Sequence, residues 1–545
     1  MTLFEQILTA RGLTTRAARQ AFLQPDYMAV KHDPFLLPDM KKAVARLKQA
    51  REQGEKIVIY GDYDIDGLSA TALLLDAFGK FGFEDVDAFI PNRFVEGYGM
   101  TMGAVDKVRD MGADLIVTVD TGSLCHAEIA YAASLGIDTV VTDHHNVAET
   151  PPPSVAAVNP KFPGHTYPFR DLCGAGVAFK LVQALQTELD GLPDGYEKWL
   201  LDLVALGTVC DIVTLADENR ANVYWGLEVL KKQQRPGLKA LMAVAGIEPE
   251  QVNARHLGFG LGPRMNAAGR LETAQHALDM LVARDGLAAL EASEKLEELN
   301  VKRRIIQDTI FEEACVQAEQ LADDRVLVVS SGGWNHGVIG IVASKLVEKY
   351  KKPVFIIGER GEEATGSARS FGDFSAADAV RAADDIIIKG GGHGAAAGVT
   401  LETQRIGDFR RRVNEFYDSL QLTNQERYLL PRADVEIDDF SEIDEELIEN
   451  LAKMEPFGNG NPEPVLKITR ASVLSMRRMG ADGQHVKLAL RDKNGKVLQM
   501  LAFNAPEEFF REPCDEVAAW FQPTINEWQG VRTVEGRLLH IILLD

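Results

Sequence analysis

The sequence contains few cysteines and no long apolar run. Its five cysteines, in 545 residues, are scattered and show no paired spacing, which is typical of reduced thiols in a cytosolic protein. No apolar run is long enough to cross a bilayer. Residues 1–5 do not begin a basic region followed by an apolar stretch, so we expect no secretion signal. We therefore expect a cytoplasmic protein without a membrane-spanning segment.

Positive charge is also scarce. The 58 Lys and Arg residues against 81 Asp and Glu residues give a formal net charge of −23. Proteins that bind nucleic acids usually carry a basic surface, so this balance argues mildly against that function. It does not exclude it, because bound metals would titrate part of the acidity, and because residues 434–449 alone contain nine acids on what is most simply a solvated helix face. Any contact with DNA must come from a local basic groove.

The length predicts several domains, and the hydrophobic pattern divides the chain. Short apolar strands alternate with helical stretches in residues 46–215, which is typical of a parallel α/β sheet, and a second α/β unit begins at about residue 325. Residues 287–322 form one helical pattern without Pro or Gly, and the final 80 or so residues have the short strands and turns of an antiparallel barrel. We expect a helical segment (1–45), an α/β lobe (46–215), a helical region (216–285), a connecting helix (286–323), a second α/β lobe (324–425) and a β-barrel (430–545).

Polar residues follow three of the apolar runs in the first lobe. The runs 56–60, 114–119 and 138–142 read as buried parallel strands. Open α/β sheets place their sites at the carboxyl ends of such strands, so we expect the following side chains to meet there. These side chains are Asp62, Asp64 and Asp66 after the first run, Asp120 after the second, and Asp143, His144 and His145 after the third.

A metal site explains this cluster better than separate structural roles do. A lone Asp after a strand is most often the N-cap of the next helix, and His144 with His145 could be ordinary surface residues. Three alternating aspartates closed by Gly67 are harder to explain as caps, because a continuing strand would point them the same way and their charges would repel. Oxygen-rich ligation with a minority of histidine suits Mn²⁺ or Mg²⁺ better than structural zinc.

These motifs resemble those of the DHH phosphoesterase family, and more closely those of its RecJ-like single-strand-specific DNA exonucleases. The resemblance extends over nearly the whole chain. It includes Asp143-His144-His145, residues 61–67 (GDYDIDG), 97–99 (GYG), 209–213 (VCDIV), 262–270 (GPRMNAAGR), 390–398 (GGGHGAAAG) and 455–464 (EPFGNGNPEP).

The resemblance implies a cytosolic enzyme with a second lobe of the DHH-associated type and a C-terminal oligonucleotide-binding (OB) fold. Family members degrade single-stranded DNA from the 5′ end to mononucleotides in recombination and repair, often beside a single-strand-binding protein. A narrow cleft between the lobes would admit one strand and exclude a duplex. A monomer is the simplest expectation for a chain with several domains.

The resemblance also assigns the metal ligands, with two divalent ions, Mn²⁺ or Mg²⁺, held about 4 Å apart. Asp120 would bridge them, Asp62 and Asp64 would favour one, and the other would take Asp66, His144 and Asp211. His145 would contact the phosphate or donate a proton, which completes a catalytic set of seven residues. Many DHH enzymes have His where this chain has Tyr60, a poor ligand, so we expect a thinner ligand shell at the first metal.

Substrate contacts are expected at five further places. The Gly-rich run with Gly391, Gly392 and His393 would let backbone N–H groups approach a phosphate. Arg369, near Ser367, offers a planar donor fork for a terminal phosphate, although an ordinary surface Arg is the alternative. Residues 334–340 open a helix whose start would bind an anion or serve only as a turn. The remaining expected contacts are Arg93 and Tyr98 in one loop and Arg264, Asn266 and Arg270 in another.

Two other functions are consistent with parts of the sequence. A DHH phosphatase acting on short oligoribonucleotides or small nucleotides would use the same cluster, but such proteins usually lack a barrel, so residues 430–545 count against it. A catalytically dead DNA-binding scaffold would keep the fold and lose the metals. The presence of all seven catalytic candidates argues against that alternative.

Overall fold

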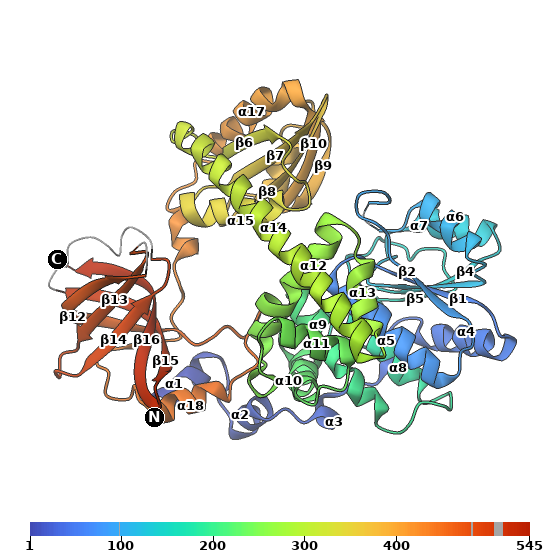
Figure 1. The fold of residues 1–545 in the computed structure, drawn as a ribbon, viewed down its shortest axis with the longest axis horizontal. Coiled ribbons are helices and arrows are strands. Elements are labelled where there is room, and N and C mark those ends of the chain that lie inside the picture. The colour runs from blue at the N-terminus through green and yellow to red at the C-terminus, as the bar shows by residue number, and fades with distance from the viewer. Residues whose placement is uncertain (98, 481–482, 506–515, 545) are drawn as a thin grey trace. The chain divides into compact units, whose positions relative to one another are not determined.

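The computed structural model describes residues 1–97, 99–480, 483–505 and 516–544. The chain forms two compact units. Unit 1 comprises Met1–Pro91, Glu96–Gly262 and Pro431–Asp545, and unit 2 comprises Asn92–Val95 and Pro263–Leu430. Unit 1 contains the first α/β lobe and the C-terminal barrel, and unit 2 contains the long helix and the second α/β lobe (Figure 1).

The first lobe is built on a five-stranded parallel sheet with the order β2-β1-β3-β4-β5. β1 and β3 are buried along their whole length because helices cover both faces of the sheet, as expected for near-continuous apolar strands (Figure 1). Gly61 pairs with Val119, and Val119 pairs with Thr142, so β1, β3 and β4 end in register. The strands are β1 (Ile57–Gly61), β2 (Val86–Phe89), β3 (Leu115–Val119), β4 (Asp138–Thr142) and β5 (Ala156–Val158).

The helices of the first lobe differ in how deeply they are buried. The apolar side chains of β1, β3 and β4 pack against α6 and α7 through one cluster that includes Tyr60, Val105 and Ile129. α8 is buried at every position, and it packs with α5 and α9. The helices are α4 (Met40–Gln53), α5 (Ile65–Phe81), α6 (Met102–Asp110), α7 (His126–Ser134), α8 (Gly174–Leu185), α9 (Leu201–Cys210), α10 (Asp217–Lys231) and α11 (Pro236–Val244).

The N-terminal helices do not pack as a separate segment. Leu3, Ile7 and Leu8 of α1 (Leu3–Ala10) belong to the same apolar cluster as the barrel residues Phe440 and Phe521. α3 (Tyr27–Val30) contacts α10 of the first lobe, and α2 (Arg16–Leu23) lies between them in the chain. The start of the chain therefore shares cores with the two parts of unit 1.

Unit 2 contains the predicted long helix. α14 (Gly286–Gln320) has 35 residues, and the carboxylate of Asp285 caps its start by accepting hydrogen bonds from Leu287 and Ala288. The second sheet has the order β6-β7-β8-β10-β9, in which only the β6–β7 pair is parallel. Its elements are β6 (Leu327–Gly332), α15 (Ile339–Tyr350), β7 (Val354–Arg360), β8 (Glu363–Arg369), α16 (Ala376–Arg381), β9 (Ile387–His393), β10 (Ala396–Glu402) and α17 (Ile406–Ser419), preceded by α12 (Gly262–Leu271) and α13 (Gln275–Val282).

The C-terminal part is a closed barrel, but it is not wholly antiparallel. β12, β13, β14, β16 and β15 pair in that order, and the β12–β15 pairing closes the ring. β14 and β16 are parallel because β15 intervenes in sequence and its hairpin with β16 brings β16 back beside β14. This corrects the expected antiparallel arrangement, and the predicted OB-like fold class is confirmed. The elements are β11 (Val435–Ile437), α18 (Glu445–Ala452), β12 (Leu466–Met479), β13 (His485–Arg491), β14 (Val497–Ala502), β15 (Glu516–Trp528) and β16 (Val531–Leu544).

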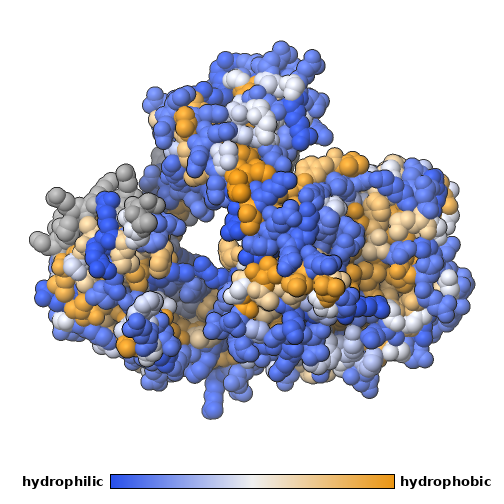
Figure 2. Space-filling view, in the orientation of Figure 1, coloured by the Kyte–Doolittle hydropathy of each residue, from blue (hydrophilic) through white to orange (hydrophobic). Residues whose placement is uncertain are grey.

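The surface is mainly hydrophilic, as expected from the amino-acid composition. Hydrophilic residues cover most of the face shown in Figure 2, and apolar residues occur there in smaller patches. In the described parts of the chain, the length and the apolar character needed to cross a membrane do not coincide in any helix.

Candidate metal centre and substrate-binding residues

The three acids of the first motif lie on a strand-to-helix turn. β1 ends at Gly61, and Asp64 caps α5 by accepting hydrogen bonds from the N–H groups of Asp66 (2.9 Å) and Gly67 (3.1 Å). The expected alternation along a continuing strand is therefore wrong, because the helix begins at Ile65. Capping and metal ligation are compatible here, since a carboxylate has two oxygens. A side chain at Gly67 is excluded, because its Cβ would lie 2.5 Å from the carbonyl oxygen of Asp62.

Asp120 follows β3 in a left-handed backbone conformation. Its φ is +61°, and its N–H donates to the carbonyl oxygen of Thr142 at the end of β4. A non-glycine residue in this conformation is uncommon and often occurs at functional sites. Its side chain is buried, and Gly174 at the start of α8 lies so close that a Cβ there would be 2.5 Å from the Cβ of Asp120. The carboxylate of Asp120 is thus held between two strand ends and a helix start.

Asp143 holds the loop that carries both histidines. Its carboxylate accepts hydrogen bonds from the N–H groups of Ser123, His144 and His145 and from Nδ1 of His145 at 2.9 Å. Burial alone would raise the pKa of Asp143, but the bond to His145 and its charge outweigh burial and lower that pKa to about 2. The same pair raises the pKa of His145 to about 9 despite its partial burial. Asp143 therefore orients His145, a role for which the sequence analysis did not select it.

The ring of His144 lies close to three carboxylates that come from different parts of the chain. Its Nε2 lies 3.0 Å from Oδ1 of Asp120, 3.5 Å from Oδ2 of Asp211 and 3.7 Å from Oδ2 of Asp66. Asp211 is the C-cap of α9. Asp66 accepts hydrogen bonds from the N–H groups of Gly174 and Ala175 at the start of α8. Residues that are up to about 150 positions apart in the sequence therefore meet at one edge of the sheet.

The candidate ligand atoms fall into overlapping groups whose members all lie within 4.8 Å of one another. Asp120 belongs to two of these groups, which places it between the ligands expected for each ion. The groups are Asp62, Asp64 and Asp120; Asp66, His144 and Asp211; and Asp120, His144 and His145.

The electrostatics of this cluster fit a bound cation. Burial and the neighbouring acids raise the pKa of Asp66 to about 6, that of Asp211 to about 8, and that of Asp120 well above its usual range. Burial and the charge of His145 lower the pKa of His144 to about 4. In the described residues, Oδ1 of Asp120 and Nε2 of His144 are buried and have no hydrogen-bond partner. Divalent cations would neutralise the acids and use both buried atoms.

Tyr60 takes no part in the cluster. Its side chain is fully buried in the sheet, and its hydroxyl donates to the carbonyl oxygen of Gly99 at 3.0 Å. Burial raises the pKa of this phenol further above its ordinary value. A neutral phenol engaged elsewhere is a poor metal ligand, and the thinner shell expected at the first metal stays a prediction.

Ser367 and Arg369 lie beside the start of α15 in unit 2. A Cβ at Gly340 would be 3.0 Å from Oγ of Ser367 and 3.4 Å from Nη2 of Arg369. Arg369 donates to Oγ of Ser367 and to the carbonyl oxygen of Ala368, and in the described chain it forms no ion pair. Burial lowers the pKa of this guanidinium. A hydroxyl, a guanidinium and a helix N-terminus thus converge, which is a suitable arrangement for an anion.

The residues of α12 have structural contacts in addition to any role with substrate. Nε of Arg264 lies 2.6 Å from Oε2 of Glu297 on α14, and Nη1 of Arg270 donates to the carbonyl oxygen of Gly337 just before α15. Asn266 lies on α12 between them and is half-buried. Arg93 is exposed in the short segment Asn92–Val95 of unit 2, and Tyr98 lies outside the described residues.

The glycine run of the second lobe lies on β9, the edge strand of its sheet. Gly391, Gly392 and His393 lie on β9, are exposed, and pair with β10. A Cβ at Gly392 would be 2.3 Å from the carbonyl oxygen of Ala396, whereas a Cβ at Gly391 would meet nothing within 4 Å. Strand packing therefore explains the glycine at 392 but leaves the glycine at 391 without a structural reason.

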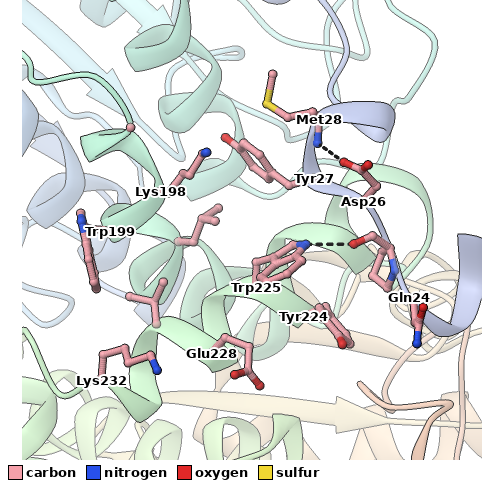
Figure 3. Close-up of a pocket in the computed structure, with 14 residues that line it drawn as sticks. Gln24, Asp26, Tyr27, Met28, Lys198, Trp199, Tyr224, Trp225, Glu228 and Lys232 are labelled. Carbon is pink, nitrogen blue, oxygen red and sulfur yellow. Dashed lines mark hydrogen bonds between the residues drawn. The ribbon is translucent and has the colours of Figure 1, made fainter.

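A separate apolar pocket lies elsewhere in unit 1 (Figure 3). It has a volume of about 810 Å³ and is lined by Trp199, Trp225 and Met28 among others. Nε1 of Trp225 donates to the carbonyl oxygen of Pro25, which ties the N-terminal segment to α10. None of the predicted site residues lines it.

Comparisons with known proteins agree with this geometry. The model of the DHH family, N-terminal domain, matches residues 56–208, that of the DHHA1 domain matches residues 323–419, and that of the RecJ OB domain matches residues 433–540. The single-stranded-DNA-specific exonuclease RecJ of Escherichia coli is 34% identical over 92% of this chain and 89% of its own length. That of Bacillus subtilis is 39% identical over 97% of this chain, which spans 66% of the relative's length.

Solved structures of RecJ proteins are also similar to this chain. A crystal structure of RecJ in complex with Mn²⁺ from Thermus thermophilus has a TM-score of 0.83 and 30% identity, covering 99% of this chain and 76% of that one. A second, in complex with Mg²⁺, has a TM-score of 0.76 and 27% identity, covering 99% and 74%. With its DHH, DHHA1 and OB domains in this order and with relatives at this identity, the chain belongs to the RecJ family of single-stranded-DNA-specific exonucleases.

Proposed function

We propose that this protein hydrolyses single-stranded DNA from the 5′ end to 5′-mononucleotides, using two divalent cations, Mn²⁺ or Mg²⁺. The observation that carries the proposal is the register of β1, β3 and β4. It places Asp62, Asp120 and the Asp143–His145 loop directly after three paired strand ends, beside Asp66 and Asp211. The names of the relatives and the cations bound in the Thermus structures support the substrate and the metals.

In this proposal Asp62 and Asp64 would hold one cation, and Asp66, His144 and Asp211 would hold the other. Asp120 would serve both, because its carboxylate lies within reach of the other ligands of each. Two divalent cations held in this way would supply a hydroxide nucleophile at neutral pH and neutralise charge on the phosphoryl oxygens. The proposed ligand side chains lie in buried surroundings, which exclude competing solvent.

His145 contacts the scissile phosphate or donates a proton to the leaving group. Its side chain is 39% exposed, unlike that of His144, so a substrate can reach it. The bond from Nδ1 to the carboxylate of Asp143 fixes the orientation of the His145 ring. The hydrogen-bonded pair of Asp143 and His145 is therefore the proton-handling and phosphate-contacting part of the site.

Ser367, Arg369 and the start of α15 bind the terminal 5′-phosphate. Arg369 supports this role because it is partly buried and its contacts are a hydroxyl and a carbonyl oxygen. A dianionic terminal phosphate gains more from such donors than an internal diester does. Arg93, Tyr98, Arg264, Asn266 and Arg270, with Gly391, Gly392 and His393, remain proposed contacts along the strand.

We also propose a role in recombination and repair, cooperation with a single-strand-binding protein, a monomeric state and a cytoplasmic location. The six domains, with the bounds given above, are a further part of the proposal. The RecJ OB match over residues 433–540 supports the exonuclease over a phosphatase of short nucleotides, because it adds a nucleic-acid-binding module to the two lobes.

The test uses a single-stranded oligonucleotide labelled at either end, with Mn²⁺, Mg²⁺ or a chelator. We expect a 5′-labelled mononucleotide to appear first and to disappear with chelator. Asp120→Ala should abolish cleavage, whereas Asp110→Ala, which removes an exposed surface acid of α6, should not. Cleavage by Asp120→Ala at the wild-type rate would contradict the site, and first release of a 3′-labelled mononucleotide would contradict the polarity.

A further inference from the structure

A turn from the C-terminal part of the chain packs on the segment that directly follows Asp211. The turn comprises residues 454–461, and Asn459 makes two contacts from it. The N–H of Leu215 donates to the carbonyl oxygen of Asn459 at 2.8 Å, and Nδ2 of Asn459 donates to the carbonyl oxygen of Ile212 at 2.8 Å. The side chain of one residue therefore reaches the residue next to a proposed metal ligand.

Ile212 has a backbone conformation that it would not adopt by itself. Its φ is +60°, in the left-handed region that is unfavourable for a β-branched residue. The residue is 69% exposed, so burial of the isoleucine does not compensate for this strain. Strained residues persist only where their surroundings determine them, and the amide of Asn459 is such a surrounding group. Asp211 immediately precedes Ile212, so the backbone conformation of Ile212 influences the direction in which the Asp211 carboxylate points.

The turn is anchored firmly enough to act as a support. Arg220 of α10 is buried and donates to three consecutive carbonyl oxygens, those of Met454 (3.0 Å), Glu455 (2.9 Å) and Pro456 (3.3 Å). The planar guanidinium group of arginine carries five N–H donors in a fixed arrangement, which suits several carbonyl oxygens held in fixed positions. The first half of the turn is thus bound to the first lobe through side chain and backbone.

The second half of the turn is held by close packing. A Cβ at Gly458 would lie 2.7 Å from Cδ1 of Leu215, and one at Gly460 would lie 2.6 Å from Cγ2 of Thr214. Nδ2 of Asn461 donates to the carbonyl oxygens of Met454 and Pro456 and so closes the turn on itself. Glycines are needed here because the turn backbone touches the segment after Asp211.

We propose that Asn459 is a positioning residue for the metal centre. It fixes Ile212 in the left-handed conformation and so aims Asp211 at His144 and Asp66. The inference rests on the proposed function, because it takes Asp211 to be a metal ligand. It makes the metal centre dependent on a turn that belongs to the same chain segment as the OB domain, so that release of this turn would weaken metal binding.

The first experiment measures Mn²⁺ binding by calorimetry without DNA. Asn459→Asp keeps the size of the side chain but cannot donate to the carbonyl of Ile212, and Asn459→Ala removes the group altogether. We expect each variant to bind Mn²⁺ about 10-fold more weakly, the loss typical of groups that orient metal ligands, with an unchanged melting temperature of the chelated protein. Asn450→Ala is the matched control, because the side chain of Asn450 accepts an exposed hydrogen bond from Nζ of Lys453 at the end of α18. Wild-type affinity in both Asn459 variants would overturn the proposal.

A rescue experiment separates positioning from general destabilisation. Glycine adopts positive φ without steric cost, so Ile212→Gly removes the strain that Asn459 offsets. The double variant Asn459→Ala with Ile212→Gly should regain Mn²⁺ affinity to within about 3-fold of the wild type. In cleavage assays, Asn459→Ala should lower kcat at fixed Mn²⁺ and leave KM for single-stranded DNA unchanged.

The two proposals fail in different ways. If the wild type binds Mn²⁺ but does not cleave single-stranded DNA, the proposed function fails while the binding assay still tests Asn459. If the double variant binds Mn²⁺ no better than Asn459→Ala, positioning through the backbone of Ile212 is wrong. If Asn459→Ala does not fold, Asn459→Asp carries the same test.

Discussion

Nε2 of His144 lies 3.0 Å from Oδ1 of Asp120, and both atoms are buried without a hydrogen-bond partner in the described residues. Such a contact between two buried polar atoms costs free energy unless a third group satisfies them. A cation bound by both atoms is that group. Asp120 and His144 each belong to two of the candidate ligand groups, so a change at either residue affects both.

Asp120→Asn should therefore separate stability from activity. The substitution keeps the shape of the side chain and removes a carboxyl group whose pKa is raised by burial and by Asp66, Asp64 and Asp62, so the metal-free protein should be more stable to unfolding at neutral pH. Cleavage of single-stranded DNA should fall by more than about 100-fold, beyond the loss seen for groups that only orient ligands. Chemical denaturation in chelator and a cleavage assay in Mn²⁺ measure the two effects. A loss of both activity and stability would instead indicate a structural role.

Mn²⁺ should stabilise the wild type against heat. A ligand that binds only the folded protein adds about 2.7 kcal/mol at a concentration 100 times its Kd. The melting temperature should rise with Mn²⁺ and return to the metal-free value with chelator. Asp120→Asn serves as the control, and its melting temperature should respond far less. Equal shifts in both proteins would mean that the ion binds elsewhere.

Asp143→Asn should reduce turnover without abolishing metal binding. The amide keeps one oxygen for the backbone N–H groups of the loop, but it loses the charge that holds Nδ1 of His145. We expect kcat to fall about 10- to 100-fold, as for other groups that orient functional histidines, with Mn²⁺ affinity changed less than in Asp120→Asn. Steady-state kinetics beside calorimetry would test this. A loss of Mn²⁺ binding as large as that of Asp120→Asn would place Asp143 among the ligands.

Arg369→Ala should weaken the preference for a 5′-phosphate. Charged hydrogen bonds contribute about 1.5–3 kcal/mol, so KM for a 5′-phosphorylated oligonucleotide should rise roughly 10- to 100-fold. KM for the same oligonucleotide with a 5′-hydroxyl should change little, because this substrate lacks the 5′-phosphate that Arg369 would bind. Arg411→Ala, which removes an exposed arginine of α17, is the control. Equal losses on both substrates would assign Arg369 to the backbone of the strand instead.

The sequence predicted what local patterns determine. Buried strands, the long helix and the groups after β1, β3 and β4 follow from apolar periodicity and from the rule that parallel strands place their carboxyl ends at one edge. Asp64 shows that the simpler interpretation, an N-cap, and the metal interpretation apply to the same residue. Asp211 carried no local signal, and only the resemblance selected it.

Long-range contacts account for what the sequence did not predict. Asn459 meets Ile212 across 247 positions, and Ser367 and Arg369 meet the start of α15, which the sequence analysis treated separately. The parallel β14–β16 pair depends on the intervening hairpin, and α1 depends on the barrel core. None of these pairings leaves a periodic trace in the segments that form them, because periodicity records which face is buried and not against which partner.

Gly391 and Gly392, two of the exposed glycines of β9, give a matched pair for the last prediction. Gly392→Ala should disturb the β9–β10 edge, because the new Cβ would lie 2.3 Å from the carbonyl oxygen of Ala396. Gly391→Ala should leave the fold unchanged, because its Cβ would meet nothing within 4 Å. If the backbone at 391 approaches a phosphate, Gly391→Ala should raise KM for single-stranded DNA several-fold while its melting temperature stays that of the wild type. Unchanged kinetics in Gly391→Ala would remove this residue from the substrate-binding set and leave strand packing at Gly392 as the reason for the glycine run.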